Sequence, residues 1–362
     1  MRMLADARVW AQVWARVWPL GLSLLFLTSV ARVAAPQSAE RLHPAPHYYA
    51  GQTLHYQIDF RTRSSSHTSG FISNPQGASQ IDLSATLLLR LDILSTLPAS
   101  AGATVIAPAP TAQNKLRRAR MRATYEKSTV AVRGDSYDPA VADLEKQYRK
   151  LEGRAVEFTI EADGAVDEVT GLDEILDDPR AAAAIRGWFT QLASGTEFPS
   201  EGIALGQTWS KERQMPESPL AHTILRSSST YVRNGNCREN TAAESAVGDG
   251  PVPALPSPDA AEQCAEIVTR FQMKQEGNSK HGQTPDALRT RGLRSSGSWT
   301  SSGESLTYLS LTTGLPVSVT QTGADEMNMT IAATIGVEPV HYTAQTHSET
   351  HVTLLPEAPA AQ

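Results

Sequence analysis

A group of histidines near the C-terminus offers the best metal chemistry in the chain. His341, His347, Glu349 and His351 have the same parity, so on one strand their side chains would share a face. Zinc accepts imidazole and carboxylate ligands. However, alternate residues of a strand lie about 7 Å apart, which spans a single ion poorly, and the opposite face carries Val352. The pattern therefore favours a water-facing strand face, and no metal site is predicted.

Other patterns that carry catalytic chemistry do not occur in the sequence. It lacks the Gly-x-Ser-x-Gly elbow, the phosphate loop, the dinucleotide glycines and the His-Glu-x-x-His zinc motif. Ser279 lies near His281, but no apolar strand leads into this segment, which favours a solvated turn. The acidic pairs at 173–174 and 177–178 lie at the start of predicted helices, where carboxylates offset the helix dipole. No catalytic residue and no cofactor are predicted, and a non-enzymatic role is favoured.

The two cysteines, Cys237 and Cys264, bracket a Pro-rich segment of small residues, 239–262, that has no periodicity. Each cysteine adjoins a predicted strand. In an oxidising compartment, a disulfide that closes the base of this loop is the natural interpretation. A free reactive pair of thiols is the alternative.

Residues 1–35 have the pattern of an export signal. Basic residues precede an uncharged apolar run at 20–30, and small residues then place the cleavage site between residues 31 and 39. The alternative is a retained anchor, because three tryptophans spaced four residues apart would line one face of a helix. The apolar run is too short for about 30 Å of hydrocarbon. Membrane association is therefore expected only through an uncleaved N-terminus.

Composition narrows the function classes further. The formal net charge is −6, from 32 basic and 38 acidic residues, which argues against a nucleic-acid partner. Lysine supplies only seven of the basic residues, which is typical of GC-rich bacterial genomes. No apolar run reaches about 18 residues, which excludes a protein with several membrane spans. With the export signal, these features predict an exported bacterial protein, periplasmic or extracellular.

Alternating polar and apolar residues dominate the chain after the signal. In residues 51–62 and 79–97 every second residue is mostly apolar, which predicts half-buried strands. Residues 291–335 predict three or four strands, with breaks near Gly303, Gly314 and Gly323. Further strands are expected over residues 115–133, 155–160, 165–169, 206–211, 223–233, 264–274 and 340–355.

Two amphipathic helices are expected among these strands. The first begins at an Asp-Pro pair and covers residues 138–153, and the second begins at another Asp-Pro pair and covers 179–194. The apolar stripe of the second helix includes Trp188, Phe189 and Leu192. These three residues are the candidate contacts for an apolar ligand, although such a stripe more often packs into a core.

The apolar face of such long strands must be shielded from water, and two helices can shield only part of it. The sequence therefore predicts a mainly β (α+β) fold: a strongly curved antiparallel sheet or half-barrel with two amphipathic helices packed against its concave face. Residues 48–355 are expected to form a single β-rich domain, as one sheet or as two lobes. Loop insertions are expected at 98–114 and 239–262, and a disordered tail at 356–362.

Four segments carry a resemblance to a family of uncharacterised bacterial exported proteins: the G-x-x-L-x-Y-x-I strand at 51–58, EFTIEADGAVDEVTGL at 157–172, FPSEGIALGQTWS at 198–210 and SLTYLSLTTGLPVSVTQTG at 305–323. Such proteins resemble envelope half-barrels that hold lipid or lipoprotein acyl chains. The resemblance spans roughly residues 50–335. Its motifs are turns and strands, so it implies a fold and no catalytic group.

Three functions remain open on this basis. The first is non-enzymatic binding of an apolar ligand, a lipid or acyl chain, between the curved sheet and the helices. The second is a structural or interaction protein of the cell envelope with a filled core and an envelope protein as its partner. The third is an exported hydrolase with an unrecognised site.

Overall fold

A computed structural model describes residues 41–44, 46–70, 79–97, 118–134, 146, 149–161, 166–171, 198–215, 220, 222–237, 262–275, 284–333 and 338–356. These residues contain eleven strands and the four-residue helix α5 (Asp286–Arg289). The strands are β1 (Thr53–Gly70), β2 (Ser79–Leu97), β3 (Arg118–Gly134), β4 (Ala155–Ile160), β5 (Val166–Thr170), β6 (Thr208–Gln214), β7 (Thr223–Asn236), β8 (Gln263–Gln275), β9 (Leu293–Ser310), β10 (Pro316–Ala333) and β11 (Val340–Leu354).

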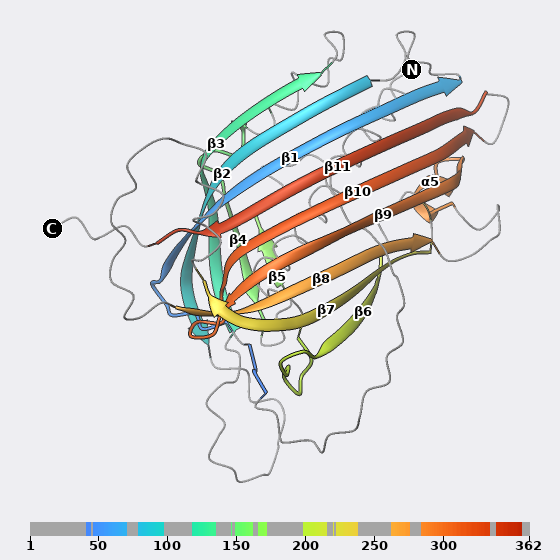
Figure 1. The fold of residues 1–362 in the computed structure, drawn as a ribbon. Coiled ribbons are helices and arrows are strands. Elements are labelled where there is room, and N and C mark those ends of the chain that lie inside the picture. The colour runs from blue at the N-terminus through green and yellow to red at the C-terminus, as the bar shows by residue number, and fades with distance from the viewer. Residues whose placement is uncertain are drawn as a thin grey trace, which may run out of the picture.

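All eleven strands belong to one antiparallel sheet, in the order β5-β4-β3-β2-β1-β11-β10-β9-β8-β7-β6 (Figure 1). The sheet consists of two meanders. Strands β1 to β5 run outward from the centre in one direction, and β11 back to β6 run outward in the other. The meanders meet where β1 pairs with β11 along nearly the whole length of both strands. The sheet is open, with β5 and β6 as its edges.

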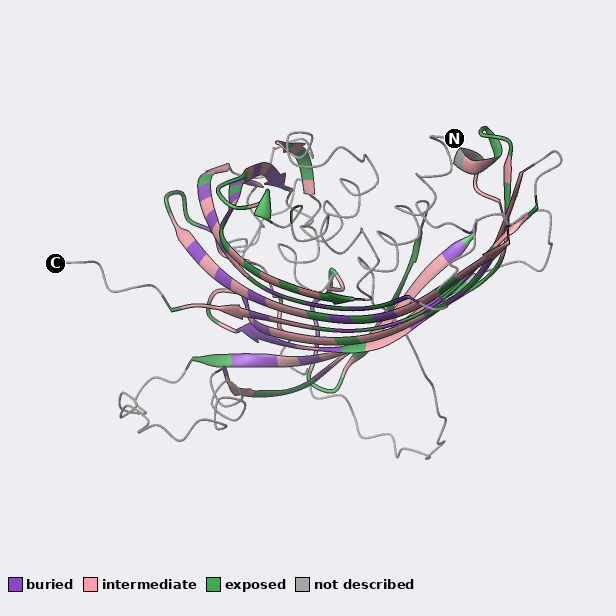
Figure 2. Cartoon of the chain, turned by 90° about the horizontal axis from the view of Figure 1, so that it is seen from above, coloured by how far each residue is buried: buried purple, intermediate pink, exposed green. Residues whose placement is uncertain are grey.

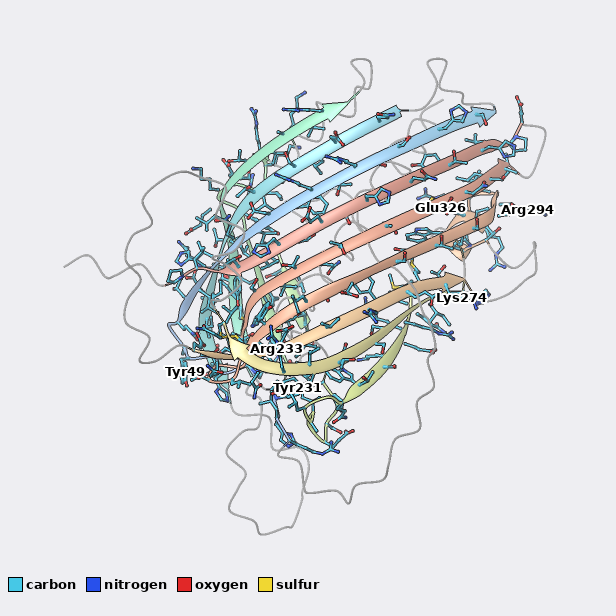
Figure 3. All side chains as sticks on the ribbon, viewed as in Figure 1. Tyr49, Tyr231, Arg233, Lys274, Arg294 and Glu326 are labelled. Carbon is cyan, nitrogen blue, oxygen red and sulfur yellow. A yellow bond between two sulfur atoms is a disulfide. The ribbon has the colours of Figure 1, made fainter. Side chains whose placement is uncertain are left out.

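The long strands bend into a trough, so the sheet has a concave and a convex face (Figure 2). Successive side chains of a strand point to opposite faces, and burial alternates accordingly: in β2, Ile81, Leu83 and Ala85 are buried while the residues between them are exposed. Most of the buried positions face the concave side. Charged residues such as Lys274 and Glu326, labelled in Figure 3, lie on the convex side.

Most strand predictions are confirmed, and the prediction for residues 291–335 is wrong in part. That segment forms two long strands, β9 and β10, with one turn near Gly314 instead of several breaks. Gly303 and Gly323 lie inside the strands and are directly opposite each other. They lack a Cβ, so the two backbones can come close, and they therefore do not interrupt the ladder.

Few residues of the two predicted amphipathic helices are among those that the structure describes. In the first, Lys146 and Arg149 are helical, and the Lys150 amide donates to the Lys146 carbonyl at 3.1 Å. The second, at 179–194, lies outside the described residues. The described part of the chain is therefore mainly β, and the packing of both helices against the concave face stays a prediction. None of the described helices has the length and apolar character needed to cross a membrane.

Gly297 allows β9 and β10 to approach closely, and Gly297→Ala is expected to destabilise the protein by about 1–3 kcal/mol. Its φ of +142° disfavours other residues, and an added Cβ would lie 2.0 Å from the Asn328 carbonyl oxygen on β10. Urea unfolding measures the loss. Gly235→Ala is the matched control, because an added Cβ there meets nothing within 4 Å. Equal midpoints for the two variants would show that the β9 backbone relaxes freely.

Candidate functional site

The concave face carries three groups of apolar side chains. The smallest consists of Ile203, Tyr231, Ala265, Ile267 and Leu309, and the other two are larger. The first apolar cluster gathers at one end of strands β1 to β4, joined by residues from the turn before β10 and from β11. Leu89, Met121 and Ile160 are among its fully buried members. Its buried members are Tyr48, Leu54, Tyr56, Ile58, Leu89, Leu91, Ile93, Ala119, Met121, Ala123, Tyr125, Val156, Phe158, Ile160, Leu315 and Val352.

The second apolar cluster lies toward the other end of β8 to β11 and is rich in methionine. Its buried members are Met215, Leu220, Met273, Trp299, Met327, Met329, Tyr342 and Ala344. Methionine side chains are flexible and polarisable, so they adapt to irregular apolar partners and recur at promiscuous binding surfaces. This cluster is therefore the more adaptable of the two.

A band of buried hydroxyl side chains separates the two clusters, and we call it the hydroxyl belt. Its members are Thr62, Ser64, Ser229, Thr269, Ser301, Ser305, Thr346 and Ser348. Two cross-strand pairs are hydrogen-bonded, Ser64 with Thr346 at 3.1 Å and Ser229 with Thr269 at 2.8 Å. A buried hydroxyl costs free energy unless it is paired, so the belt is an unusual feature for the inside of a curved sheet.

Asp325 lies at the edge of the hydroxyl belt on β10, between Ser301 of β9 and Thr346 of β11. Burial raises the pKa of its carboxyl group to about 7, although hydrogen bonding from Ser301 and Trp299 opposes this shift. Buried carboxylates are normally paired with a cation. The register neighbours of Asp325 supply none, so the carboxyl group is poised between its neutral and charged forms near neutral pH.

The convex face is organised by ion pairs between arginine and acidic side chains. Arg120 and Arg122 both donate to Glu157, at 2.7 and 2.6 Å. Hydrogen bonding from Arg122 is the main reason that the pKa of Glu157 is lowered. Arg233 and Glu266 form a similar pair at 2.8 Å across β7 and β8. Such exposed pairs add little stability each, and the convex face is thus a solvated surface.

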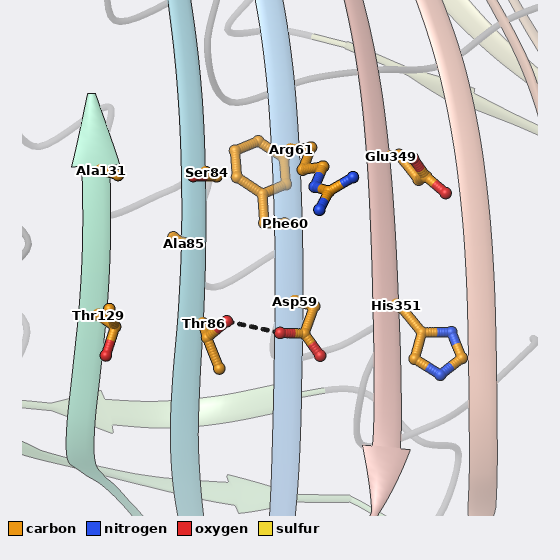
Figure 4. A pocket seen from close by; sticks show the side chains of 10 residues that line it. All are labelled: Asp59, Phe60, Arg61, Ser84, Ala85, Thr86, Thr129, Ala131, Glu349 and His351. Carbon is orange, nitrogen blue, oxygen red and sulfur yellow. Dashed lines mark hydrogen bonds between the residues drawn. The ribbon is translucent and has the colours of Figure 1, made fainter. Parts of the chain in front are cut away.

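Two hollows of about 320 and 470 Å³ also lie on the convex side. The first crosses β3, β2, β1 and β11 (Figure 4). In it, Asp59 accepts hydrogen bonds from Thr86 at 2.6 Å and from Gln57 at 2.7 Å, and His351 contacts Thr320 at 2.9 Å. These polar groups satisfy one another, and an apolar ligand would find no complementary surface there.

The predicted candidate residues fall into three groups. Cys237 and Cys264 form the predicted disulfide, with a Cα–Cα distance of 5.1 Å. The histidines of β11 point to the convex face, and no three potential ligands converge on one point within the described ranges. Trp188, Phe189 and Leu192 lie outside those ranges, so their role as ligand contacts stays a prediction.

The hydroxyl belt and Asp325 were missed by reasoning from the sequence. The available signal was weak: serine and threonine occupy the core-facing parity in the middle of β11, with apolar residues on both sides, and in the second half of β1, with apolar residues on one side only. Only the pairing of these two strands, which are far apart in the sequence, shows that the polar positions line up into a band.

Comparison with known proteins gives no family. No family model and no curated protein matches the chain. A structure of lipid–protein interactions in lipovitellin aligns over 87% of this chain at 10% identity, with a TM-score of 0.40. The chain spans about a quarter of that protein, 26% of its length.

Two outer membrane proteins also align with the chain. For OprG of Pseudomonas aeruginosa, the alignment covers 84% of this chain and 96% of that one, at 8% identity and a TM-score of 0.17. For an outer membrane channel of Pseudomonas putida F1, it covers 89% and 100%, at 6% identity and a TM-score of 0.17. The TM-scores of all three structures are too low to define a shared fold.

Proposed function

We propose that this protein is an exported, non-enzymatic binder of an apolar ligand, a lipid or acyl chain, which it holds against the concave face of its sheet. The observation that carries the proposal is the pair of apolar clusters on that face. Apolar surface is stabilised when it leaves water, by about 25 cal/mol per Å². A face with two such clusters therefore requires apolar partners along much of its length.

The described elements offer few such partners of their own. Outside the sheet, the described residues that pack on this face come from short segments, such as Leu151 beside the first cluster and Leu42 and Phe198 beside Ile203. The short helix α5 contacts β9. We assign part of the cover to the helix at 179–194, whose stripe contains Trp188, Phe189 and Leu192, and part to the ligand. In this arrangement the three side chains face the ligand from the side opposite the sheet.

Export is part of the proposal. The disulfide between Cys237 and Cys264 is consistent with an oxidising location outside the cytoplasm. Together with the signal-like residues 1–35, it supports a periplasmic or extracellular protein of a bacterial envelope. Lipids and lipoproteins are abundant there, so an apolar ligand would be at hand.

A second candidate function rests on the tight burial in the first apolar cluster. Leu89, Ala119 and Met121 have no exposed surface, which is the behaviour of a filled core. On this basis the protein would be a structural or interaction protein of the envelope, with a protein partner in place of a lipid.

The amount of lipid bound by variants of the concave face distinguishes the two functions. Met329→Gln keeps the side-chain length but puts an amide into the concave face, and it is expected to lower the amount of lipid that copurifies with the exported protein at least several-fold. Trp188→Ala is expected to do the same, with a smaller loss of stability than the roughly 3–5 kcal/mol of a fully packed tryptophan. Native mass spectrometry measures the bound lipid.

Asn328→Gln is the matched control, because it places the same glutamine side chain on the neighbouring, exposed position of β10, where an amide is already tolerated. It should retain the lipid of the wild-type protein. A wild-type protein that emerges without lipid and fails to take up a fluorescent fatty acid would contradict the proposed function and favour the filled core.

A further inference from the structure

We propose that the part of the hydroxyl belt around Thr62 and Ser348, on β1 and β11, is the binding site for the polar head of the ligand, and that this head is neutral and hydroxylated, as in a monoacylglycerol. Thr62 and Ser348 are its hydrogen-bonding groups and Asp325 its acceptor. The inference rests on the proposed function and specifies it further. It specifies the ligand as an amphiphile, whose polar head binds at these groups and whose apolar chain lies on the apolar clusters.

Two unpartnered hydroxyls mark the centre of this site. Thr62 on β1 and Ser348 on β11 are directly opposite each other, with exposed fractions of only 3% and 7%, and neither hydroxyl has a hydrogen-bond partner. The next inward-facing pair on the same two strands, Ser64 and Thr346, is bonded at 3.1 Å. The strand geometry thus permits such a bond. At Thr62 and Ser348 the hydroxyl oxygens are buried and their bonding capacity is unused.

The surface of the sheet beside Ser348 is formed by glycines and therefore carries no side chains. In register with Ser348, the inward-facing positions of β10 and β9 are Gly323 and Gly303. A Cβ at Gly303 would lie 2.0 Å from the Thr322 carbonyl oxygen, so the close approach of these strands requires a glycine there. Two unpartnered hydroxyls therefore adjoin two positions without side chains, and this combination presents hydrogen-bonding groups beside bare backbone to a ligand head.

The charged side chains near Ser348 and Gly323 indicate which kind of ligand head group would bind there. Asp325 is two residues from Gly323 on the same face and accepts hydrogen bonds. The nearest inward-facing cations by register, Lys211 and Arg213, are on β6, four strands from β10 and hence about 19 Å along the sheet. An anionic head would face a carboxylate with no nearby cation among the described residues of the sheet. A hydroxylated neutral head can donate to Asp325 and exchange hydrogen bonds with Thr62 and Ser348.

The two apolar clusters on either side of the belt supply an apolar surface for the acyl chain. Along β11, Val352 belongs to the first apolar cluster and Ala344 to the second, with Ser348 midway between them. The two ends are about 26 Å apart at the usual rise of a strand. A head bound at the belt therefore has an apolar surface on either side for its chain.

Competition against a fluorescent fatty acid, with the full-length exported protein, tests this assignment. The two competitors are a monoacylglycerol and the methyl ester of the same fatty acid, which differ in the hydroxyls of the head. Hydrogen bonds are worth about 1 kcal/mol each, so the monoacylglycerol is expected to compete at a concentration about ten-fold lower. In Thr62→Val/Ser348→Ala this ratio should fall to the few-fold that Asp325 alone supplies, with the methyl ester unaffected.

The matched control is Ser229→Ala/Thr269→Val, which removes two belt hydroxyls that satisfy each other. It should keep the wild-type preference. A wild-type protein that binds both competitors equally would overturn the assignment of the belt while the proposed function stands. A wild-type protein that binds neither competitor nor the probe would overturn both. The ratio of the two competitor concentrations for the wild-type protein tests the assignment even where a variant folds poorly.

Discussion

At pH 8, Asp325→Asn is expected to raise the free energy of unfolding by as much as about 4 kcal/mol, whereas at pH 4 its effect should shrink to less than about 1 kcal/mol. Burial raises the pKa of this carboxyl group from 3.8 to about 7. Between these two values the folded protein binds the proton more tightly than the unfolded chain. Stability therefore falls as the pH rises through this window and levels off above pH 7.

The groups that face Asp325 do not change this expectation. On β9 they are Ser301 and Trp299, and on β11 the opposite residue is Thr346. None of these side chains ionises near neutral pH, so the titration belongs to Asp325. An asparagine keeps the size of the side chain and removes the charge.

Urea unfolding at pH 4, 6 and 8 measures the effect. Glu326→Gln is the matched control, because Glu326 is the exposed neighbour on the convex face of β10. Its stability change should be small and nearly independent of pH. If Asp325→Asn behaved in the same way, the carboxyl group would have to be hydrated in solution, and its place in the belt would need revision.

The fold was predictable where the hydrophobic pattern was unbroken. Residues 79–97 alternate along their whole length and form one strand, β2, with the predicted bounds. Residues 291–335 were misjudged because Gly303 and Gly323 were interpreted as breaks. A glycine inside a strand weakens it locally but also allows two backbones to approach closely, and the sequence does not show which effect prevails.

The candidate site was much less predictable than the strands. The helix stripe with Trp188 and Phe189 attracted attention because large apolar residues at helical spacing are a strong local signal. The hydroxyl belt has no such signal, because it depends on β1 pairing with β11. Ser64 and Thr346 are 282 residues apart in the sequence, and alternation within a strand does not identify its neighbour. The parity of each residue was predictable, and the register was not.

The disulfide is the second feature for which we expect a large effect. Cys237 follows β7, and Cys264 lies near the start of β8, directly opposite Gly235. The bond closes a sequence separation of 27 residues. The entropy that it removes from the unfolded chain corresponds to about 3–4 kcal/mol. Both half-cystines are buried against Tyr308 of β9, so the bond also ties this hairpin end to the neighbouring strand.

Cys237→Ser/Cys264→Ser is therefore expected to lose about 3–4 kcal/mol of unfolding free energy, while the circular dichroism of the sheet remains. The ladder between β7 and β8 does not depend on the bond, because its register continues for the length of both strands. Urea unfolding with and without reductant measures the loss. Reductant should lower the stability of the wild-type protein to that of the double variant and leave the variant unchanged. Two reactive thiols in the denatured, unreduced wild-type protein would refute the bond itself.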